Sequence, residues 1–249
     1  MKIQLSVNKN EFQRFLELVE LSGDIQTKET LIVCKDSVIS VLARTYNKIV
    51  IYKGMWKVDC KDNFEIGIDD ITLLQKFVSN FPTDSINLKI TDAKLELSSV
   101  TPKLRFTVPL RKAEYILTKI EESKFTSYLA LAITNMVKIP QNVVKSIIGY
   151  SDLLGGKSLL LTGKDTDVIL EIENNQNNIV AEFNINQEFK PFITKISNLF
   201  VDLLSTIGSD ITLSVAKENS PVYLKTESEK ITFEYLIAPL EVKKDDKAE

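Results

Sequence analysis

The chain has 249 residues, a formal net charge of −3, two cysteines and no histidine. Without histidine, Ser-His-Asp and Cys-His catalytic sites are excluded, and an enzyme would have to rely on carboxylates or lysine. The apolar runs are shorter than the ~20 residues of a membrane span, and neither a signal peptide nor a metal-binding cysteine spacing is present, so we expect a protein that is neither secreted nor membrane-bound.

The first half of the chain predicts a series of strands interrupted by two helices. Apolar residues alternate over 3–7, as in a half-buried strand, and then follow helical spacing over 8–23. Asn8 or Asn10 can cap this helix, and Gly23 can end it. The predicted order is β-α-β-β-β-β-α-β-β-β. The other assigned ranges are strands at 30–34, 37–43, 47–53, 85–90, 94–99 and 103–110, and a helix at 69–80.

The second half predicts the same order of elements again. A strand at 136–140 is followed by a helix at 141–154, which Gly155 and Gly156 end. A Pro-Leu pair closes each half, at 109–110 and at 239–240. The repeated order predicts a duplicated domain. The remaining ranges are strands at 157–162, 167–173, 178–185, 189–196, 210–216, 221–226 and 230–238, and a helix at 197–207 that ends at Gly208.

The segment 112–134 fits neither repeat. It mixes charged residues with apolar ones and contains no Gly or Pro, so a floppy linker is not expected. We interpret it as an extended connector lying against the surface, with a short helix as the alternative. The predicted organisation is an N-terminal domain at 1–111, an interdomain connector at 112–134, a C-terminal domain at 135–241 and a charged tail at 242–249.

Two similar halves, an apolar connector and the closing sequence Tyr235-Leu236-Ile237-Ala238-Pro239 together resemble the PCNA-type DNA sliding clamps. The resemblance implies an α+β DNA-clamp fold of two similar domains, with helices lining the inner face of a ring and antiparallel sheets outside. It implies a processivity factor that encircles duplex DNA and tethers DNA polymerase and other replication and repair enzymes. Such a protein performs no catalysis, uses no cofactor and depends on a clamp loader. It is expected inside the cell at the site of DNA replication, in the cytoplasm or nucleoid, or in the nucleus of a eukaryote.

The resemblance also assigns residues to DNA. Basic side chains outside the apolar stripe of each helix would meet phosphates without reading sequence. The helix at 197–207 departs from this pattern because it carries Asp202 and no basic residue. An ordinary solvated helix face is the alternative interpretation. The DNA-facing residues implied by position are Lys9, Arg14, Lys76 and Lys145.

A partner-peptide pocket is implied beneath the connector, where a peptide with one aliphatic and two aromatic anchors would bind. Leu236 and Ile237 can alternatively be ordinary strand residues. Edge strands at 104–112 and 178–185 would pair between subunits. The sequence leaves open a homotrimer, a heterotrimer and a clamp-fold interaction protein that forms no ring. The implied pocket residues are Ala43, Val50, Leu117, Ile120, Phe125, Pro221, Leu236, Ile237, Ala238 and Pro239.

Overall fold

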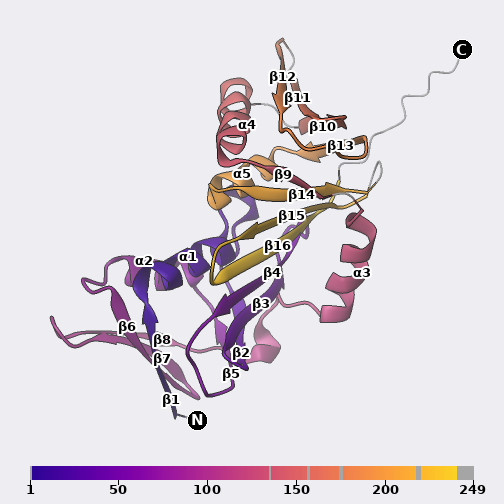
Figure 1. The fold of residues 1–249 in the computed structure, drawn as a ribbon. Coiled ribbons are helices and arrows are strands. Elements are labelled where there is room, and N and C mark those ends of the chain that lie inside the picture. Colours follow the sequence, from indigo (N-terminus) through magenta and orange to yellow (C-terminus); the bar gives the residue numbers. More distant parts are fainter. Residues whose placement is uncertain (1, 135, 156–157, 174–175, 217–219, 240–249) are drawn as a thin grey trace, which may run out of the picture. The chain divides into compact units, whose positions relative to one another are not determined.

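The computed structural model describes residues 2–134, 136–155, 158–173, 176–216 and 220–239 (Figure 1). The chain divides into two compact units, Met1–Glu122 with Glu227–Glu234 and Ser123–Thr226 with Tyr235–Glu249. Helices and antiparallel sheets occur in both units, as the α+β prediction requires. Within the described residues, no helix is long and apolar enough to cross a membrane.

The first half of the chain follows the predicted order of elements. One strand, β5, lies outside the ranges assigned from sequence. Its five residues do alternate, but the strand is short and contains Gly67, and glycine is uncommon in strands. In chain order the elements are β1 (Lys2–Asn8), α1 (Lys9–Glu20), the 3-10 helix η1 (Gly23–Ile25), β2 (Thr30–Lys35), β3 (Val38–Arg44), β4 (Val50–Lys57), β5 (Phe64–Ile68), α2 (Ile71–Ser79), β6 (Ser85–Thr91), β7 (Lys94–Ser99) and β8 (Leu104–Pro109).

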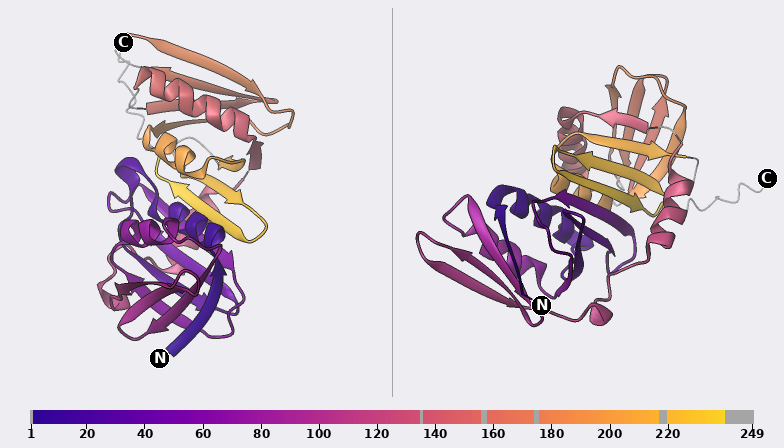
Figure 2. Two further views of the ribbon diagram at one scale, coloured as in Figure 1. Left: turned by 90° about the vertical axis from the view of Figure 1, so that its left-hand side faces the viewer. Right: turned by 60° about the horizontal axis from the view of Figure 1, so that its bottom comes forward.

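The second half repeats this order. Figure 2 shows α4 lying against the strands of its own unit, where it packs on β11 and β12. The elements are β9 (Met136–Ile139), α4 (Gln141–Leu154), β10 (Ser158–Lys164), β11 (Asp167–Glu173), β12 (Asn178–Asn184), β13 (Phe192–Ser197), α5 (Leu199–Ile207), β14 (Ile211–Val215), β15 (Val222–Glu227) and β16 (Ile231–Ile237).

The strand orders confirm the duplicated domain. The first half contains the orders β1-β6-β7-β8 and β5-β2-β3-β4, and the second half contains β9-β14-β15-β16 and β13-β10-β11-β12. Within each half the strand order is therefore the same. The halves differ at one place: β4 and β16 are neighbours in a single eight-stranded sheet, whereas their counterparts β12 and β8 each end a separate sheet. The alternation of apolar residues sets the register, since Leu5 pairs with Leu88 and Leu88 pairs with Leu97 on one buried face.

The first residues of β16 belong to the first compact unit. The Lys57 amide donates to the Lys230 carbonyl over 2.9 Å. A Cβ atom on Gly54 would lie 2.4 Å from Cζ of Phe233, so only glycine permits this close approach of strand and ring.

Helix ends agree with the sequence at some sites and correct it at others. Asn8, one of the two predicted caps of α1, accepts a hydrogen bond from the Glu11 amide over 3.1 Å. The predicted stop at Gly23 is wrong, because α1 ends earlier, with Leu21 at φ 59° as its C-cap. Gly155 and Gly208 do end α4 and α5, both in the left-handed conformation. Gly156 lies outside the described residues.

The connector is only partly as predicted. The 3-10 helix η2 (Ala113–Tyr115) is followed by residues 116–121, which form neither helix nor strand apart from a bridge between Lys119 and Ala43. The extended interpretation is wrong for α3 (Glu122–Ala132), where the alternative of a short helix is correct. Phe125 is buried on this helix. The segment therefore packs an apolar side chain into the protein and does not only lie along its surface.

Candidate functional site

The connector is tied to the first unit by its backbone. The Arg44 amide, at the end of β3, donates to the Thr118 carbonyl over 2.8 Å. Ala43 forms an antiparallel bridge with Lys119. The Arg111 amide donates to the Gly67 carbonyl over 2.9 Å, which attaches the start of the connector to β5. The connector segment therefore follows a defined course across these strands.

A buried carboxylate that the sequence analysis did not single out lies beneath this segment. Glu29 has a relative exposure of 3% and immediately precedes β2. Its Oε1 accepts from the Leu117 amide over 2.6 Å, and its Oε2 accepts from Arg111 Nη1 over 3.0 Å. Arg111 Nη1 also donates to Asp69 Oδ1 over 2.8 Å. No local sequence signal marks Glu29, because its partners lie more than eighty residues away in the chain.

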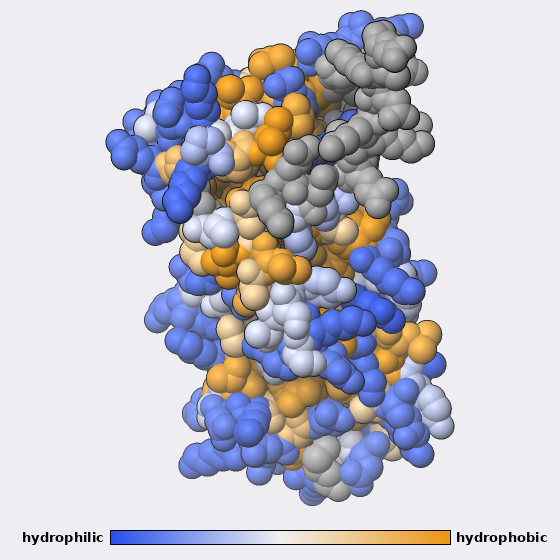
Figure 3. Space-filling model, turned by 90° about the vertical axis from the view of Figure 1, so that its right-hand side faces the viewer, coloured by the Kyte–Doolittle hydropathy of each residue, from blue (hydrophilic) through white to orange (hydrophobic). Residues whose placement is uncertain are grey.

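Apolar side chains stay on the surface in patches, which are orange in Figure 3. On and beside the connector of the first unit, Leu117 is 68% exposed, Tyr115 53% and Tyr46 50%. Partial burial, together with the negative charge of Glu29, raises the pKa of the Tyr46 phenol above its ordinary value. Exposed aromatic and aliphatic side chains of this kind are suited to contact with a partner.

The predicted pocket residues of the first unit differ in accessibility. Ala43 and Val50 are both 1% exposed, so their side chains belong to the core beneath the surface. The Val50 amide and carbonyl are occupied by Thr45 in the turn between β3 and β4. Leu117 is exposed and Ile120 is half-buried. Of these four residues, Leu117 has the most accessible side chain.

The other predicted pocket residues belong to the second unit. Phe125, Leu236 and Ile237 are buried, as ordinary core residues of α3 and β16 would be. Ala238 is exposed, and Pro221 and Pro239 are half-buried. The pocket as a whole stays a prediction.

The two predicted DNA-facing residues of α1 have partners within the first unit. Lys9 Nζ donates to the Phe81 carbonyl over 2.5 Å. Arg14 lies 3.3 Å from Glu17 in an ion pair on the same helix. Both side chains are half-buried. Their charges are therefore partly engaged inside the protein.

The other two predicted residues are exposed. Lys76 on α2 and Lys145 on α4 are in no ion pair among the described residues. The helices pack in pairs, α1 with α2 and α4 with α5. On α5, Asp202 is half-buried. The role of all four basic residues at DNA stays a prediction.

Comparisons with known proteins identify the fold. No protein-family model matches the chain, and no curated protein matches it by sequence. Solved structures do match. The proliferating cell nuclear antigen (PCNA) of Entamoeba histolytica is 14% identical, with a TM-score of 0.77 over 96% of this chain and 98% of the other. This chain has the PCNA clamp fold.

Two further structures have the same fold. A. fulgidus PCNA, solved with the bound C-terminal region of FEN-1, is 15% identical with a TM-score of 0.78, over 96% of this chain and 98% of the other. A chain of the PCNA2–PCNA3 complex of Sulfolobus tokodaii is 12% identical with a TM-score of 0.76, over 96% and 99%. At identities of 12–15%, the fold is shared although no family model and no curated protein match the chain.

Six strands lie at the ends of the described sheets, and two of them fall in the edge ranges predicted from the sequence. β8 ends the sheet β1-β6-β7-β8, and β12 ends the sheet β12-β11-β10-β13, so both predicted edge ranges do contain edge strands. On β12, Val180 is 61% exposed. Open edges are available for pairing with another chain.

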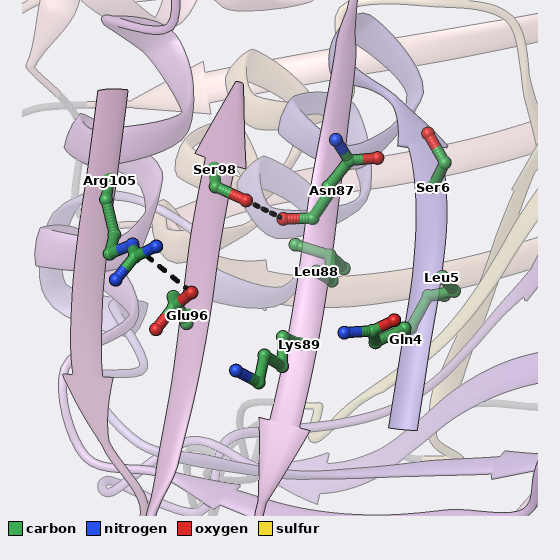
Figure 4. Close-up of a pocket in the computed structure, with 9 residues that line it drawn as sticks. All are labelled: Gln4, Leu5, Ser6, Asn87, Leu88, Lys89, Glu96, Ser98 and Arg105. Carbon is green, nitrogen blue, oxygen red and sulfur yellow. Dashed lines mark hydrogen bonds and ion pairs between the residues drawn. The ribbon is translucent and has the colours of Figure 1, made fainter. Parts of the chain in front are cut away.

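The sheet β1-β6-β7-β8 also has a polar depression of about 490 Å³ on one face (Figure 4). Glu96 is 7% exposed there, and its Oε1 lies 3.3 Å from Arg105 Nε. The Ser98 hydroxyl donates to the Asn87 carbonyl. The lining residues do not include any residue of the predicted pocket or of the DNA-facing set.

Proposed function

We propose that this protein is a DNA sliding clamp, a processivity factor that encircles duplex DNA and tethers replication and repair enzymes to it. The observation that carries the proposal is the match to PCNA structures over nearly the whole length of both chains. The duplicated strand order supports it, because two equivalent domains are the building unit of a symmetric ring. The protein acts without catalysis or cofactor, at the site of DNA replication.

The proposed ring closes through its open edges. β8 of one copy pairs with β12 of the next, which satisfies the backbone donors and acceptors of both edge strands. Three copies in a homotrimer are the default arrangement. The PCNA2–PCNA3 complex supports oligomerisation and makes a ring of different chains the other form to test.

Lys76 and Lys145 are the proposed DNA contacts with the most available charge. Both are exposed and unpaired among the described residues, so their ammonium groups can approach phosphates without first breaking an internal ion pair. Sparse electrostatic contacts permit sliding because they carry no sequence information. Lys9 and Arg14 contribute less, since internal partners hold them.

The proposed partners include DNA polymerase, other clamp-binding proteins and a clamp loader. The FEN-1 region bound to A. fulgidus PCNA supports partner binding through peptide segments. In this chain, accessible side chains on and beside the connector in the first unit include Leu117, Tyr115 and Tyr46, which suit the apolar anchors of such a peptide.

A second candidate is a clamp-fold interaction protein that forms no ring. The charges of the helices favour it: Lys9 and Arg14 are internally engaged, and α5 carries Asp202 with no basic residue. A helix surface with little free positive charge attracts DNA weakly.

The first experiment is the solution mass by light scattering at micromolar concentration and moderate salt. A mass near three times that of the chain supports the homotrimeric ring. Retention on closed circular DNA with loss from the linearised form then tests encirclement. A monomer that stays monomeric with DNA and with partner chains contradicts the clamp and supports the second candidate.

A further inference from the structure

We infer that Glu29 is the positioning residue for the connector, which it holds in place on the first unit, and that partner-peptide affinity depends on it. The dependence of affinity rests on the proposed function, whereas the positioning of the connector does not. The inference starts from the most deeply buried carboxylate among the described residues that contacts this segment.

Glu29 binds the connector at three successive points. Its carboxylate accepts from Arg111 Nη1 over 3.0 Å and from the Leu117 amide over 2.6 Å. Its backbone carbonyl accepts from the Thr118 hydroxyl over 3.0 Å, and both residues are buried. One residue therefore holds the start and the middle of the segment 111–118.

The chemistry of these bonds makes the anchor strong. A carboxylate that accepts from a guanidinium and from a backbone amide forms charge-assisted hydrogen bonds, which are shorter and stronger than neutral ones. Because Glu29 is 3% exposed, water does not compete well for it. The same Nη1 of Arg111 also donates to Asp69, so two carboxylates hold this end of the guanidinium.

The consequence for the surface concerns Leu117. Its amide is bound to Glu29, while its side chain is 68% exposed. The bond thus holds the backbone of Leu117 at the protein and leaves its side chain outward. If the connector detaches from the first unit, the exposed side chains that would contact a peptide lose their fixed positions. Binding must then order them, and this entropic cost reduces the affinity for the peptide.

Glu20 supplies a matched control. It is also a buried carboxylate of the first unit, with a relative exposure of 6%. Its Oε1 accepts from Gln26 Nε2 over 2.8 Å and from the Thr72 hydroxyl over 2.7 Å. Neither partner lies in the connector. Glu20→Gln therefore removes a comparable buried charge without touching the segment 111–118.

The test is amide hydrogen exchange on the full chain, comparing Glu29→Gln with Glu20→Gln. We expect exchange of the Leu117 amide, which donates to the Glu29 carboxylate, to accelerate about tenfold or more in Glu29→Gln, the factor that follows from replacing a charge-assisted hydrogen bond by a weaker neutral one. Exchange in the β6–β7 ladder should stay unchanged, and Glu20→Gln should leave the connector protected. Unchanged exchange at Leu117, or equal acceleration in the ladder, overturns the inference.

Two further measurements keep the inference open to refutation. If Glu29→Gln does not fold, Thr118→Val removes the hydroxyl donor at nearly constant shape, and the same acceleration is expected around residue 118. Affinity is then measured with a labelled synthetic peptide of the A. fulgidus FEN-1 C-terminal region, with about tenfold weaker binding expected for Glu29→Gln and unchanged binding for Glu20→Gln. Absence of binding by the unmodified chain counts against the proposed peptide site, and exchange alone then decides the role of Glu29.

Discussion

Helices α1 and α4 occupy the same place in the two repeats, yet their polar surfaces differ. On α1, Lys9 donates to a backbone carbonyl, Arg14 pairs with Glu17, and Glu11 accepts from both Trp56 and Lys230. On α4, Lys145 is exposed with no ion pair among the described residues. A basic residue outside an apolar stripe therefore does not by itself provide a charge available to DNA.

The aromatic residues of the two helices differ as well. Phe15 of α1 is fully buried, with its ring centroid 5.6 Å from Trp56 and 5.5 Å from Phe233. Tyr150 of α4 is 37% exposed, with its ring centroid 6.4 Å from Phe183. Both helices bury an apolar face, but α1 contributes aromatic rings to the core of its unit, whereas the aromatic ring of α4 stays partly exposed.

The largest effect is expected from the aromatic core of α1. Phe15→Ala should destabilise the protein by about 3–5 kcal/mol, because it removes buried area and leaves a cavity between two rings. Tyr150→Ala should cost less than about 1 kcal/mol, since the ring is partly solvated already. Urea unfolding of both variants checks this, and similar destabilisation of the two would abolish the distinction between the helices.

A second difference is alkaline sensitivity, because both cysteines lie in the first unit. Burial, reinforced by Cys60, raises the pKa of the Cys34 thiol from 9.0 to about 12. The folded state keeps this proton while the unfolded state loses it, so stability is retained below pH 9 and lost as the pH rises toward 12. Between these pH values, the Cys34 thiol should lower the free energy of unfolding by up to about 1.4 kcal/mol per pH unit.

Urea unfolding of the original chain and of Cys34→Ala between pH 8 and 11 measures this decrease. Stability should fall less steeply with pH in the variant, although its stability at pH 8 is lower. The buried Tyr52, whose pKa is raised by burial, is present in both proteins and cancels in the difference. Parallel pH profiles would show that Cys34 does not titrate as its burial requires.

The helix caps should give effects of about 1 kcal/mol. Asn8→Ala removes the side-chain acceptor of the Glu11 amide and should cost about that much. α4 begins after Pro140, which offers no such cap, and its Gln141 amide donates instead to Asp210 over 2.8 Å. Asp210→Ala should therefore cost a similar amount, and thermal unfolding compares the two. No effect of Asp210→Ala would mean that water replaces this cap.

The smallest effect on the protein itself is expected at Lys145. Lys145→Ala should leave stability unchanged but reduce the slope of log affinity against log salt by about one for each phosphate that the side chain no longer neutralises. Arg14→Ala should change the slope less, because Glu17 already neutralises Arg14. Binding to a short duplex at several salt concentrations measures both slopes. A larger change for Arg14→Ala would reverse the assignment.

The sequence by itself determined the features that depend on local patterns. Alternating apolar residues placed β1 and its buried face, because side chains in a strand point alternately to either side. Helical spacing placed α1 and α4, and glycine marked the ends of α4 and α5, since it adopts the left-handed conformation without strain. The repeated order of such elements, together with the apolar connector and the closing sequence at 235–239, resembled the clamp family.

Only the tertiary structure decided which polar groups are available. Glu29 is the anchor of the connector because folding brings it to Leu117 and Arg111, and no local pattern encodes that contact. The same holds for Lys9, whose ammonium is engaged by the Phe81 carbonyl seventy-two residues away. The sequence gives the type and charge of each residue. The burial of a polar side chain and its hydrogen-bond partners depend instead on how folding brings together residues that are far apart in the chain.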